Sequence, residues 1–264
     1  MKNFLIILIF GYLVLPDLLG QGQTPYTVRK GIIYKQERFF DLAIHSNGFY
    51  VGYNLGKIRT YYRTNYLHFD FGLLENPREQ SIQRSNLQGN GLFSSYTYGK
   101  QKSLWNIRAG RGMVRYFSEK ATKKGAAIGV RIEGGLLLGL LKPYYLKVLK
   151  NHDGNLTLDN IKYSEENEDL FLDQNKILGA SAFRKGITEL SFIPGAWFRA
   201  GVTVDQGAFE KQVRAINAGI SLDLYPKRVP IMVNRRNLFL YPNFYVNLQF
   251  GTRTTRSKGF DKEN

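Results

Sequence analysis

The sequence predicts an all-β protein, a transmembrane antiparallel up-and-down β-barrel of about ten strands. The first observation is the segment 126–141, AAIGVRIEGGLLLGLL, in which apolar residues alternate with small or charged residues. A period of two is the pattern of a β-strand with two unlike faces, and this segment is far longer than the usual 5–6 residues of globular strands. The second observation is that at least five other segments repeat the alternation. Transmembrane barrels alternate lipid-facing and lumen-facing residues in this way.

A transmembrane helix is the main alternative for 126–141, and it would need about 20 mainly apolar residues. The uncharged run in this segment covers only Gly134–Leu141, and the charged residues Glu133 and Lys142 bound it. We therefore interpret the segment as a strand.

The first residues have the pattern of an export signal. Lys2 precedes an apolar run from Phe4 to Leu15, and the small residue Gly20 stands just before Gln21. This pattern is typical of a signal peptide at 1–20, so we expect cleavage near Gly20–Gln21 and localisation in the bacterial cell outer membrane. Because the chain contains no cysteine, we expect packing and backbone pairing alone to hold the exported fold.

Strand candidates follow one another along the rest of the chain. Asn47-Gly48 between two alternating segments is a strong hairpin signal, which predicts a strand on each side of it. Alternation gives nine clear candidates, at 37–45, 49–56, 62–74, 92–100, 103–117, 126–141, 190–205, 214–224 and 244–250.

Bacterial single-chain barrels have even numbers of strands, so we expect a tenth strand in 26–34 or in the 225–243 connection, within a range of eight to twelve. Arg111 and Arg115 break the alternation of their segment, which indicates either a β-bulge near 110–112 or a strand end outside the membrane. The expected organisation is a signal peptide at 1–20, a barrel at 21–251 with a long loop at about 142–189, and a flexible polar tail at 252–264.

The chain is strongly basic, with a formal net charge of +16. Such a charge often indicates nucleic-acid binding, but here the cations fall in candidate turns and strand ends, without a recognition helix. We therefore expect no nucleic-acid partner. The cations instead fit outer-membrane lipid or lipopolysaccharide headgroups, and the alternative is a solvated rim without a specific ligand.

Tyrosine is abundant, and much of it falls near the ends of candidate strands. Tyrosine collects at membrane interfaces, although its ordinary β propensity is an alternative explanation. The tyrosines that we expect in an interface girdle are Tyr61, Tyr62, Tyr66, Tyr144, Tyr145 and Tyr241.

Several charged and polar residues are expected to face the lumen. Buried charges must be paired, so we expect these residues to fill a narrow lumen by bonding to one another. An alternative is that His68 and Asp70, two apart on one strand face, are catalytic residues of a lipid-modifying enzyme, with Ser221 or Ser95 as the nucleophile. The sequence has no G-x-S-x-G, P-loop or zinc signature to support an enzyme. The expected lumen network consists of His68, Asp70, Arg108, Arg131, Glu133, Arg199, Asp223 and Asn247.

The long loop at 142–189 is rich in acidic residues. Acidic loops can hold calcium, but the spacing here matches no EF-hand loop, so we expect neither a metal nor a cofactor. Its length makes this loop the best candidate for a cap over one mouth of the barrel, or for a surface that binds other envelope proteins. The acidic residues are Asp153, Asp159, Glu165, Glu166, Glu168, Asp169 and Asp173.

Four short segments give the sequence a resemblance to a known family. They are HSNGF (His45–Phe49), YGKQ (Tyr98–Gln101), EGGLLLGLLKPYYL (Glu133–Leu146) and NLQFG (Asn247–Gly251). The chain resembles a family of outer-membrane β-barrel proteins of the Bacteroidota, whose function is undefined. The resemblance implies the fold and the location, and it assigns no catalytic residue.

The sequence therefore predicts a non-enzymatic outer-membrane barrel, structural or an accessory subunit of an envelope assembly. The alternatives are the lipid-modifying enzyme that uses His68 and Asp70, and a small passive channel.

Overall fold

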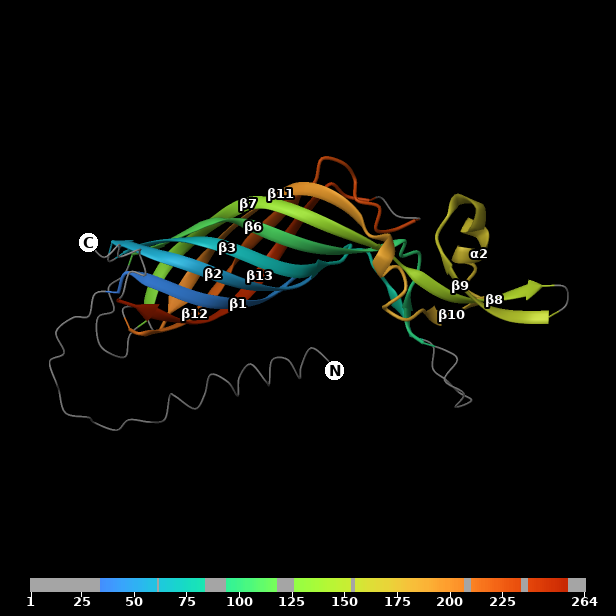
Figure 1. Cartoon of the computed structure of the whole chain (residues 1–264), viewed down its shortest axis with the longest axis horizontal. Helices are drawn as coiled ribbons and strands as arrows, with labels where there is room; N and C mark the ends of the chain where they lie inside the picture. Colours follow the sequence, from blue (N-terminus) through green and yellow to red (C-terminus); the bar gives the residue numbers. More distant parts are fainter. Residues whose placement is uncertain are drawn as a thin grey trace, which may run out of the picture. The chain divides into compact units, whose positions relative to one another are not determined.

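The computed structural model describes residues 34–60, 62–83, 94–117, 126–152, 155–206, 210–233 and 237–255. Eight of the described strands form one closed antiparallel barrel, in the order β1-β13-β12-β11-β7-β6-β3-β2 (Figure 1). The barrel strands are β1 (Gln36–His45), β2 (Gly48–Thr60), β3 (Arg63–Leu74), β6 (Lys102–Tyr116), β7 (Ala127–Pro143), β11 (Ser191–Asp205), β12 (Gln212–Leu224) and β13 (Leu240–Thr254).

The remaining elements lie in the connections between barrel strands. Two short strands pair with each other, and three more form a separate sheet in the order β10-β8-β9. No helix in the described part of the chain is long and apolar enough to cross a membrane. These elements are β4 (Ser81–Ile82), β5 (Tyr96–Thr97), β8 (Tyr145–His152), β9 (Asn155–Lys162), η2 (Glu165–Asn167), α2 (Glu168–Leu172), β10 (Ile177–Ala180) and η3 (Ile187–Glu189).

Alternating side chains explain why these segments close into a barrel. On β7, Ile132 and Leu136 are 42% and 76% exposed on the outer surface, whereas Arg131 and Glu133 are buried inside. The other barrel strands alternate in the same sense, for example Phe69 outward beside buried neighbours on β3. The pattern predicted for 126–141 is confirmed, and the barrel has an apolar outside and a polar inside, the reverse of a soluble protein.

The barrel has eight strands, so the prediction of about ten is wrong, although eight lies within the predicted range. The candidate 92–100 fails because only Tyr96–Thr97 is extended in its described part. The chain then turns at Gly99, whose φ of 66° lies in the left-handed region that favours glycine. The described part of the 225–239 connection adds only one isolated bridge, from Met232 to Lys100. Of the segment 26–34, only Tyr34 is described.

Strand β6 contains no bulge. It pairs in unbroken register with β3 and β7, and Arg111 and Arg115 both lie on the outer surface. The alternation is therefore continuous, and these two arginines are outward-facing exceptions to an apolar surface.

The last barrel strand is longer than predicted. Thr252–Thr254 belong to β13, because Thr254 still pairs with Gln36 of β1. The boundary predicted for the polar tail is thus wrong by three residues, since 252–254 are strand. Residues 256–264 and the predicted signal peptide at 1–20 lie outside the described residues.

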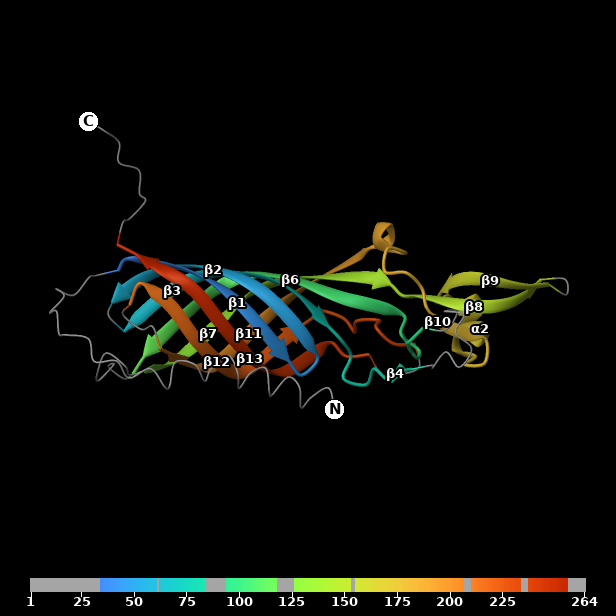
Figure 2. The same ribbon diagram turned by 90° about the horizontal axis from the view of Figure 1, so that it is seen from below.

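The connections differ between the two ends of the barrel (Figure 2). We call one end the long-loop end, and it carries the connections 75–101, 144–190 and 225–239 as well as the tight turn at 46–47. We call the other the short-turn end, where β1 begins, β13 ends, and the connections are 61–62, 117–126 and 206–211.

Residues 144–190, which we call the long-loop module, contain their own small fold. The predicted loop at 142–189 matches this connection within two residues, but it holds the sheet β10-β8-β9 and helix α2. Leu146, Phe171 and Ile177 are fully buried in one apolar cluster with Tyr96 from the 75–101 connection. The module is therefore a packed unit and not an irregular loop.

A second apolar cluster, which we call the mouth cluster, lies at the long-loop end. Val229 and Ile231 of the 225–239 connection are fully buried against inward residues of the barrel such as Leu104 and Ile193. Trp197 belongs to the same cluster. This connection thus packs apolar side chains against the interior of the barrel.

Candidate functional site

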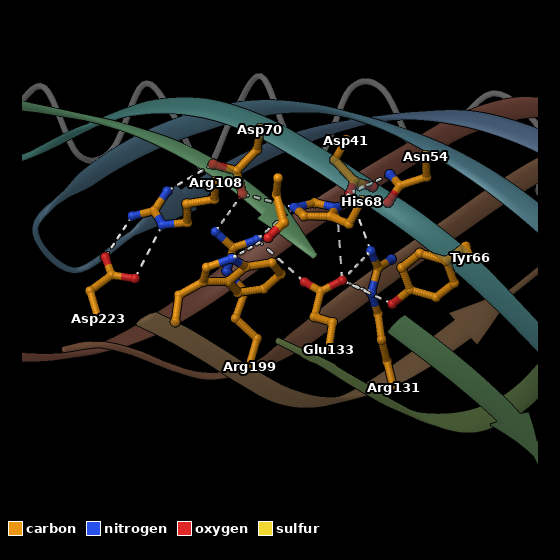
Figure 3. Close-up of polar contacts among 12 residues, drawn as sticks. Asp41, Asn54, Tyr66, His68, Asp70, Arg108, Arg131, Glu133, Arg199 and Asp223 are labelled. Carbon is orange, nitrogen blue, oxygen red and sulfur yellow. Dashed lines mark hydrogen bonds and ion pairs between the residues drawn. The ribbon is translucent and has the colours of Figure 1, made fainter. Parts of the chain in front are cut away.

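The candidate site is a set of polar and charged side chains inside the barrel, drawn in Figure 3, which we call the lumen network. Each member occupies an inward position on its strand, and none is more than 5% exposed. They come from seven of the barrel strands, so residues distant in sequence meet here. The members are Asp41, Asn54, Tyr66, His68, Asp70, Arg108, Arg131, Glu133, Arg199 and Asp223.

Asp70 on β3 is the centre of one half of the network (Figure 3). Arg108 Nη1 donates to its Oδ1 at 2.9 Å, and Arg199 Nη2 donates to its Oδ2 at 2.7 Å. The ring Nε2 of His68 lies 2.8 Å from the same Oδ2. One buried carboxylate is thus held by two guanidinium groups, as the high cost of an unpaired buried charge requires.

Arg108 also links Asp70 to a second carboxylate. Its Nε and Nη2 donate to the two oxygens of Asp223 at 3.1 and 2.6 Å. Two parallel bonds of this kind fix the geometry of both side chains, so β3, β6 and β12 are tied together across the lumen.

Glu133 on β7 is the centre of the other half. Its Oε2 accepts hydrogen bonds from Arg131 Nη2 at 2.8 Å and from the Tyr66 hydroxyl at 2.9 Å. Arg199 Nη1 donates to its Oε1 at 3.3 Å, which joins the two halves. Arg131 Nη2 also reaches Asp41 Oδ2 on β1, at 3.2 Å.

Aromatic rings cover the two arginines that cross the lumen. The Arg131 guanidinium lies 4.7 Å from the centre of the Tyr66 ring, and that of Arg199 lies 3.9 Å from Tyr50 and 4.6 Å from Trp197. Contacts of a desolvated cation with a ring face are attractive, so these rings add to the ion pairs.

His68 is bonded on both ring nitrogens. Nδ1 lies 2.7 Å from Asn54 Oδ1, and Nε2 faces Asp70. The side chain is fully buried, and in the described hydrogen bonds neither Ser221 nor Ser95 is a partner of His68. His68 and Asp70 therefore meet as predicted, but as members of a filled network that keeps the imidazole away from the surface.

Seven of the eight residues predicted for the lumen network belong to it. The exception is Asn247, which is buried in the lumen without a hydrogen-bond partner for either side-chain atom among the described residues. The prediction missed Asp41, Asn54 and Tyr66 as members. Asp41 and Asn54 stand between outward apolar residues of their strands, so alternation itself was the signal that could have found them.

A second, smaller set of buried ion pairs lies toward the short-turn end. Arg253 Nε donates to Glu37 Oε2 at 3.0 Å, and its Nη2 donates to Asp205 Oδ2 at 2.7 Å. The Tyr116 hydroxyl donates to the same Asp205 oxygen at 3.0 Å. The sequence analysis missed this set because it placed Arg253 in the tail.

The predicted tyrosine girdle is wrong for Tyr66 and Tyr241. Both side chains lie in the barrel interior, 3% and 0% exposed, because their strand positions alternate with outward apolar residues. Tyr62 is exposed, 37%, and Tyr61 lies outside the described residues. Tyr144 and Tyr145 bond instead to Thr97 and Glu189, which belong to the long-loop end.

The described residues contain no group of three or more histidine or acidic side chains that could hold a metal ion. Asp153 of the predicted acidic cluster lies outside the described residues. Glu168 of that cluster accepts a hydrogen bond from the Tyr163 hydroxyl.

The fold can be compared with solved barrels. The chain is similar to the N-terminal β-barrel domain of OprF from Pseudomonas aeruginosa, with 10% identity and a TM-score of 0.32 over 84% of this chain and 98% of that one. It is similar to Neisserial surface protein A (NspA), with 10% identity and a TM-score of 0.34 over 84% and 97% of the two chains. No protein-family model and no curated protein matches the sequence.

Proposed function

We propose that this chain is a bacterial outer-membrane β-barrel that catalyses no reaction and serves as a structural or accessory subunit of an envelope assembly. The observation that carries the location is the inverted distribution of side chains. Leu136 and Phe244 are 76% and 73% exposed on the outer surface, while Arg131 and Arg199 are buried inside. Hydrocarbon is the solvent in which an apolar outside surface and satisfied internal polar groups are favourable.

The closure of the sheet supports the same location. Strands β1 and β13 pair along their facing lengths, from Gln36 with Thr254 to His45 with Tyr245. A bilayer core offers no water to unpaired backbone groups, so a sheet can cross it only as a closed barrel. This barrel meets that requirement.

The filled interior supports a role without catalysis or conduction. The lumen network ties seven barrel strands together, and the mouth cluster packs apolar side chains at the long-loop end. In small barrels the interior is just wide enough for side chains to fill. His68 and Asp70 serve this filling, which argues against their use on a substrate.

The long-loop module supports the assembly role. It has its own apolar core, yet Leu158 and Phe183 on its surface are 49% and 62% exposed. Strand β9 lies at one edge of the sheet β10-β8-β9, and among the described strands it pairs only with β8. A packed module with exposed apolar side chains and a free strand edge is suited to binding another envelope protein.

Cell fractionation and heat-modifiable gel migration test the proposed location. We expect the protein in the outer-membrane fraction, and faster migration of unboiled than of boiled samples, because a closed barrel resists detergent until heated. Recovery in the soluble periplasmic fraction, with migration unaffected by boiling, would refute the membrane barrel.

Site-specific photo-crosslinking tests the assembly role. A photo-reactive residue at Leu158 or Phe183 should form adducts with a discrete protein, whereas the same residue at Phe69, outward on the barrel and 48% exposed, should not. Recovery of the protein without adducts from intact membranes at both module positions would contradict the accessory role.

Two measurements separate the proposal from an enzyme and a channel. We expect His68→Asn to leave the lipid A profile of the membrane unchanged, and the wild-type barrel to give no conductance steps in planar bilayers. A changed lipid A profile would support the enzyme hypothesis, and regular conductance steps would support the channel hypothesis.

A further inference from the structure

A groove on the outer surface near the short-turn end is lined by cations, and we call it the basic groove. Lys57 and Arg59 of β2, Arg63 of β3 and Arg111 of β6 line it. It has a volume of about 750 Å³, and all four cations are exposed. These side chains lie on three strands that are neighbours in the barrel.

The cations are not neutralised by protein carboxylates. Arg63 Nε donates to the neutral amide oxygen of Asn65 at 3.2 Å. Among the described residues, no ion pair joins Lys57, Arg63 or Arg111 to an acidic side chain. The groove thus presents uncompensated positive charge to whatever lies outside the barrel.

The strand register adds a like-charge pair at the same place. Arg63 on β3 stands directly opposite Arg115 on β6, and both point outward. Like charges directly opposite each other destabilise a strand pair. A bound anion would turn this repulsion into attraction.

Five outward cations near the short-turn end lie on the neighbouring strands β2, β3 and β6, namely Lys57, Arg59, Arg63, Arg111 and Arg115. Single outward cations also lie on β1, at Arg38, and on β12, at Arg214. The basic groove is therefore where outward cations of several adjacent strands come together.

Most of the other side chains that line the groove are apolar, and the polar residues Asn65, Tyr66 and Glu133 line it as well. Leu67, Ile132 and Phe198 line it beside the cations and are 43%, 42% and 47% exposed. A ligand that fits must carry an anionic group next to a hydrocarbon chain, which is the chemistry of an anionic phospholipid.

We infer that the basic groove binds an anionic phospholipid of the inner leaflet, with its headgroup phosphate among Arg59, Arg63 and Arg111 and its acyl chain over Phe198. Arginine suits this task because its planar guanidinium matches the geometry of phosphate oxygens. The inference rests on the proposed outer-membrane location.

The position of the groove indicates which leaflet of the outer membrane its ligand belongs to. Outer-membrane barrels have short turns on the periplasmic side and long loops outside, so the short-turn end lies at the inner leaflet. That leaflet contains phospholipid, whereas lipopolysaccharide occupies the outer one, next to the long-loop end. The phosphate in the groove therefore belongs to a phospholipid.

Lipid binding to the full-length, folded barrel tests the inference. The full-length barrel in detergent would be titrated with dioleoyl phosphatidylglycerol, and lipid binding would be measured by native mass spectrometry. Dioleoyl phosphatidylcholine, whose headgroup is zwitterionic and has no net charge, is the comparison. We expect preferential retention of phosphatidylglycerol by the wild type, and binding roughly thirtyfold weaker in the double variant Arg63→Gln/Arg111→Gln, since each cation near an anionic lipid accounts for about a fivefold change. Arg63→Lys/Arg111→Lys keeps the charge and should lose about fivefold or less.

The matched control is Arg214→Gln, which removes an exposed outward cation on β12 at the same end of the barrel. We expect its phosphatidylglycerol binding to stay within about twofold of the wild type. Equal losses in Arg214→Gln and in the double variant would overturn the localised site, because they would indicate general attraction only. Stronger competition by lipopolysaccharide than by phosphatidylglycerol for the same residues would overturn the assignment to phospholipid.

A measurement in phosphatidylcholine nanodiscs separates this inference from the proposed location. The double variant should insert and show heat-modifiable migration like the wild type, because it removes exposed charges and no buried partner. If neither protein inserts, the membrane barrel itself is refuted. If both insert and neither prefers phosphatidylglycerol, only the lipid site is refuted.

Discussion

Individual charges inside the barrel depend on several partners at once. Arg131 contacts two carboxylates and an aromatic ring, and Asp70 accepts bonds from two arginines and faces a histidine. Removal of one member therefore leaves other buried charges uncompensated, and the effect on stability exceeds that of a surface ion pair.

Arg131→Met tests this dependence. The change leaves Glu133 and Asp41 without their shared guanidinium, and we expect a loss of about 3–5 kcal/mol in the free energy of unfolding. The measurement is urea-induced unfolding in detergent or lipid, followed by gel migration and tryptophan fluorescence.

The double variant Arg131→Met/Glu133→Leu is the control, because it removes both charges of the closest pair. It should recover part of the stability lost in the single variant, since an apolar replacement of a buried pair is often tolerated. Equal stability of the wild type and Arg131→Met would show that the ion pairs of Arg131 do not stabilise the folded barrel.

At the scale of single residues, alternation was a better guide than residue type. It placed Arg108, Arg131 and Arg199 inward correctly, because each stands between outward apolar or small neighbours. Tyr66 was assigned to the interface from its type and its place near a strand end. The outward Leu67 beside it already implies that Tyr66 faces the lumen.

At the scale of strands, glycine provides space for the large side chains of the lumen. Gly112 on β6 stands directly opposite Tyr66 on β3, and a Cβ at Gly112 would overlap the ring of Tyr66. That ring position is the one from which the hydroxyl bonds to Glu133. The small inward residues thus determine where the network can form.

Gly112→Ala should displace the Tyr66 ring and weaken its bond to Glu133. We expect a loss of roughly 1–3 kcal/mol in unfolding free energy, the usual effect of forcing extra volume into a packed interior. Ala218→Val, which adds volume on the outer surface of β12, is the matched control and should change stability by less than about 0.5 kcal/mol. A loss of similar size in both variants would argue against the steric explanation.

The long-loop module contains pH-sensitive hydrogen bonds that join strands β8 and β9 to η3. Lys162 Nζ at the end of β9 and the Tyr145 hydroxyl of β8 both donate to the carboxylate of Glu189 in η3. Both hydrogen bonds lower the pKa of Glu189 below its usual value, and the bond from Lys162 has the larger effect. A carboxyl group with a lowered pKa in the folded protein stabilises it above the unfolded pKa and loses that effect as pH falls through the folded pKa.

Amide hydrogen exchange should detect this loss. Protection of 187–189 should be constant at neutral pH and should fall as the solution is acidified below the ordinary pKa of a glutamate. Glu189→Gln should show reduced protection that no longer depends on pH in this range. If the protection of 187–189 in the wild type did not change on acidification, these hydrogen bonds would not have the expected pH dependence.

Strand number was the element-level feature that the sequence could not supply. The segment 92–100 alternates like a strand, but its described part packs Tyr96 into the module core and turns at Gly99. The 225–239 connection contains the apolar residues Val229 and Ile231, which enter the mouth cluster and do not form a barrel strand. Both outcomes depend on contacts with distant parts of the chain, which local patterns do not record.

At the scale of the whole molecule, the exposed apolar residues fall into two environments. Leu136 on β7 faces outward from the barrel, and Leu158 on β9 lies on the surface of the long-loop module. The proposed location puts hydrocarbon around the first and water or a protein partner around the second.

Arginine substitutions at these two leucines test that division. Leu136→Arg should destabilise the folded barrel in a bilayer by about 2–4 kcal/mol, the usual effect of a cation near the membrane midplane of a barrel. Leu158→Arg is the matched control, and we expect a change within about 0.5 kcal/mol, as for an ordinary surface position. The measurement is reversible folding into lipid vesicles, and equal effects at the two sites would contradict the assignment of the barrel surface to lipid.

The seam between β1 and β13 joins the earliest and the latest barrel strands in the chain. Asp41, near the middle of β1, accepts a hydrogen bond from Gln249 of β13 at 2.6 Å, so the charge network also crosses this seam. Because closure requires residues more than 200 positions apart, the native contacts of β1 cannot be complete until synthesis has passed β13. The ring can therefore close only after β13 has been synthesised, and a chain interrupted before residue 240 lacks the strand that completes it.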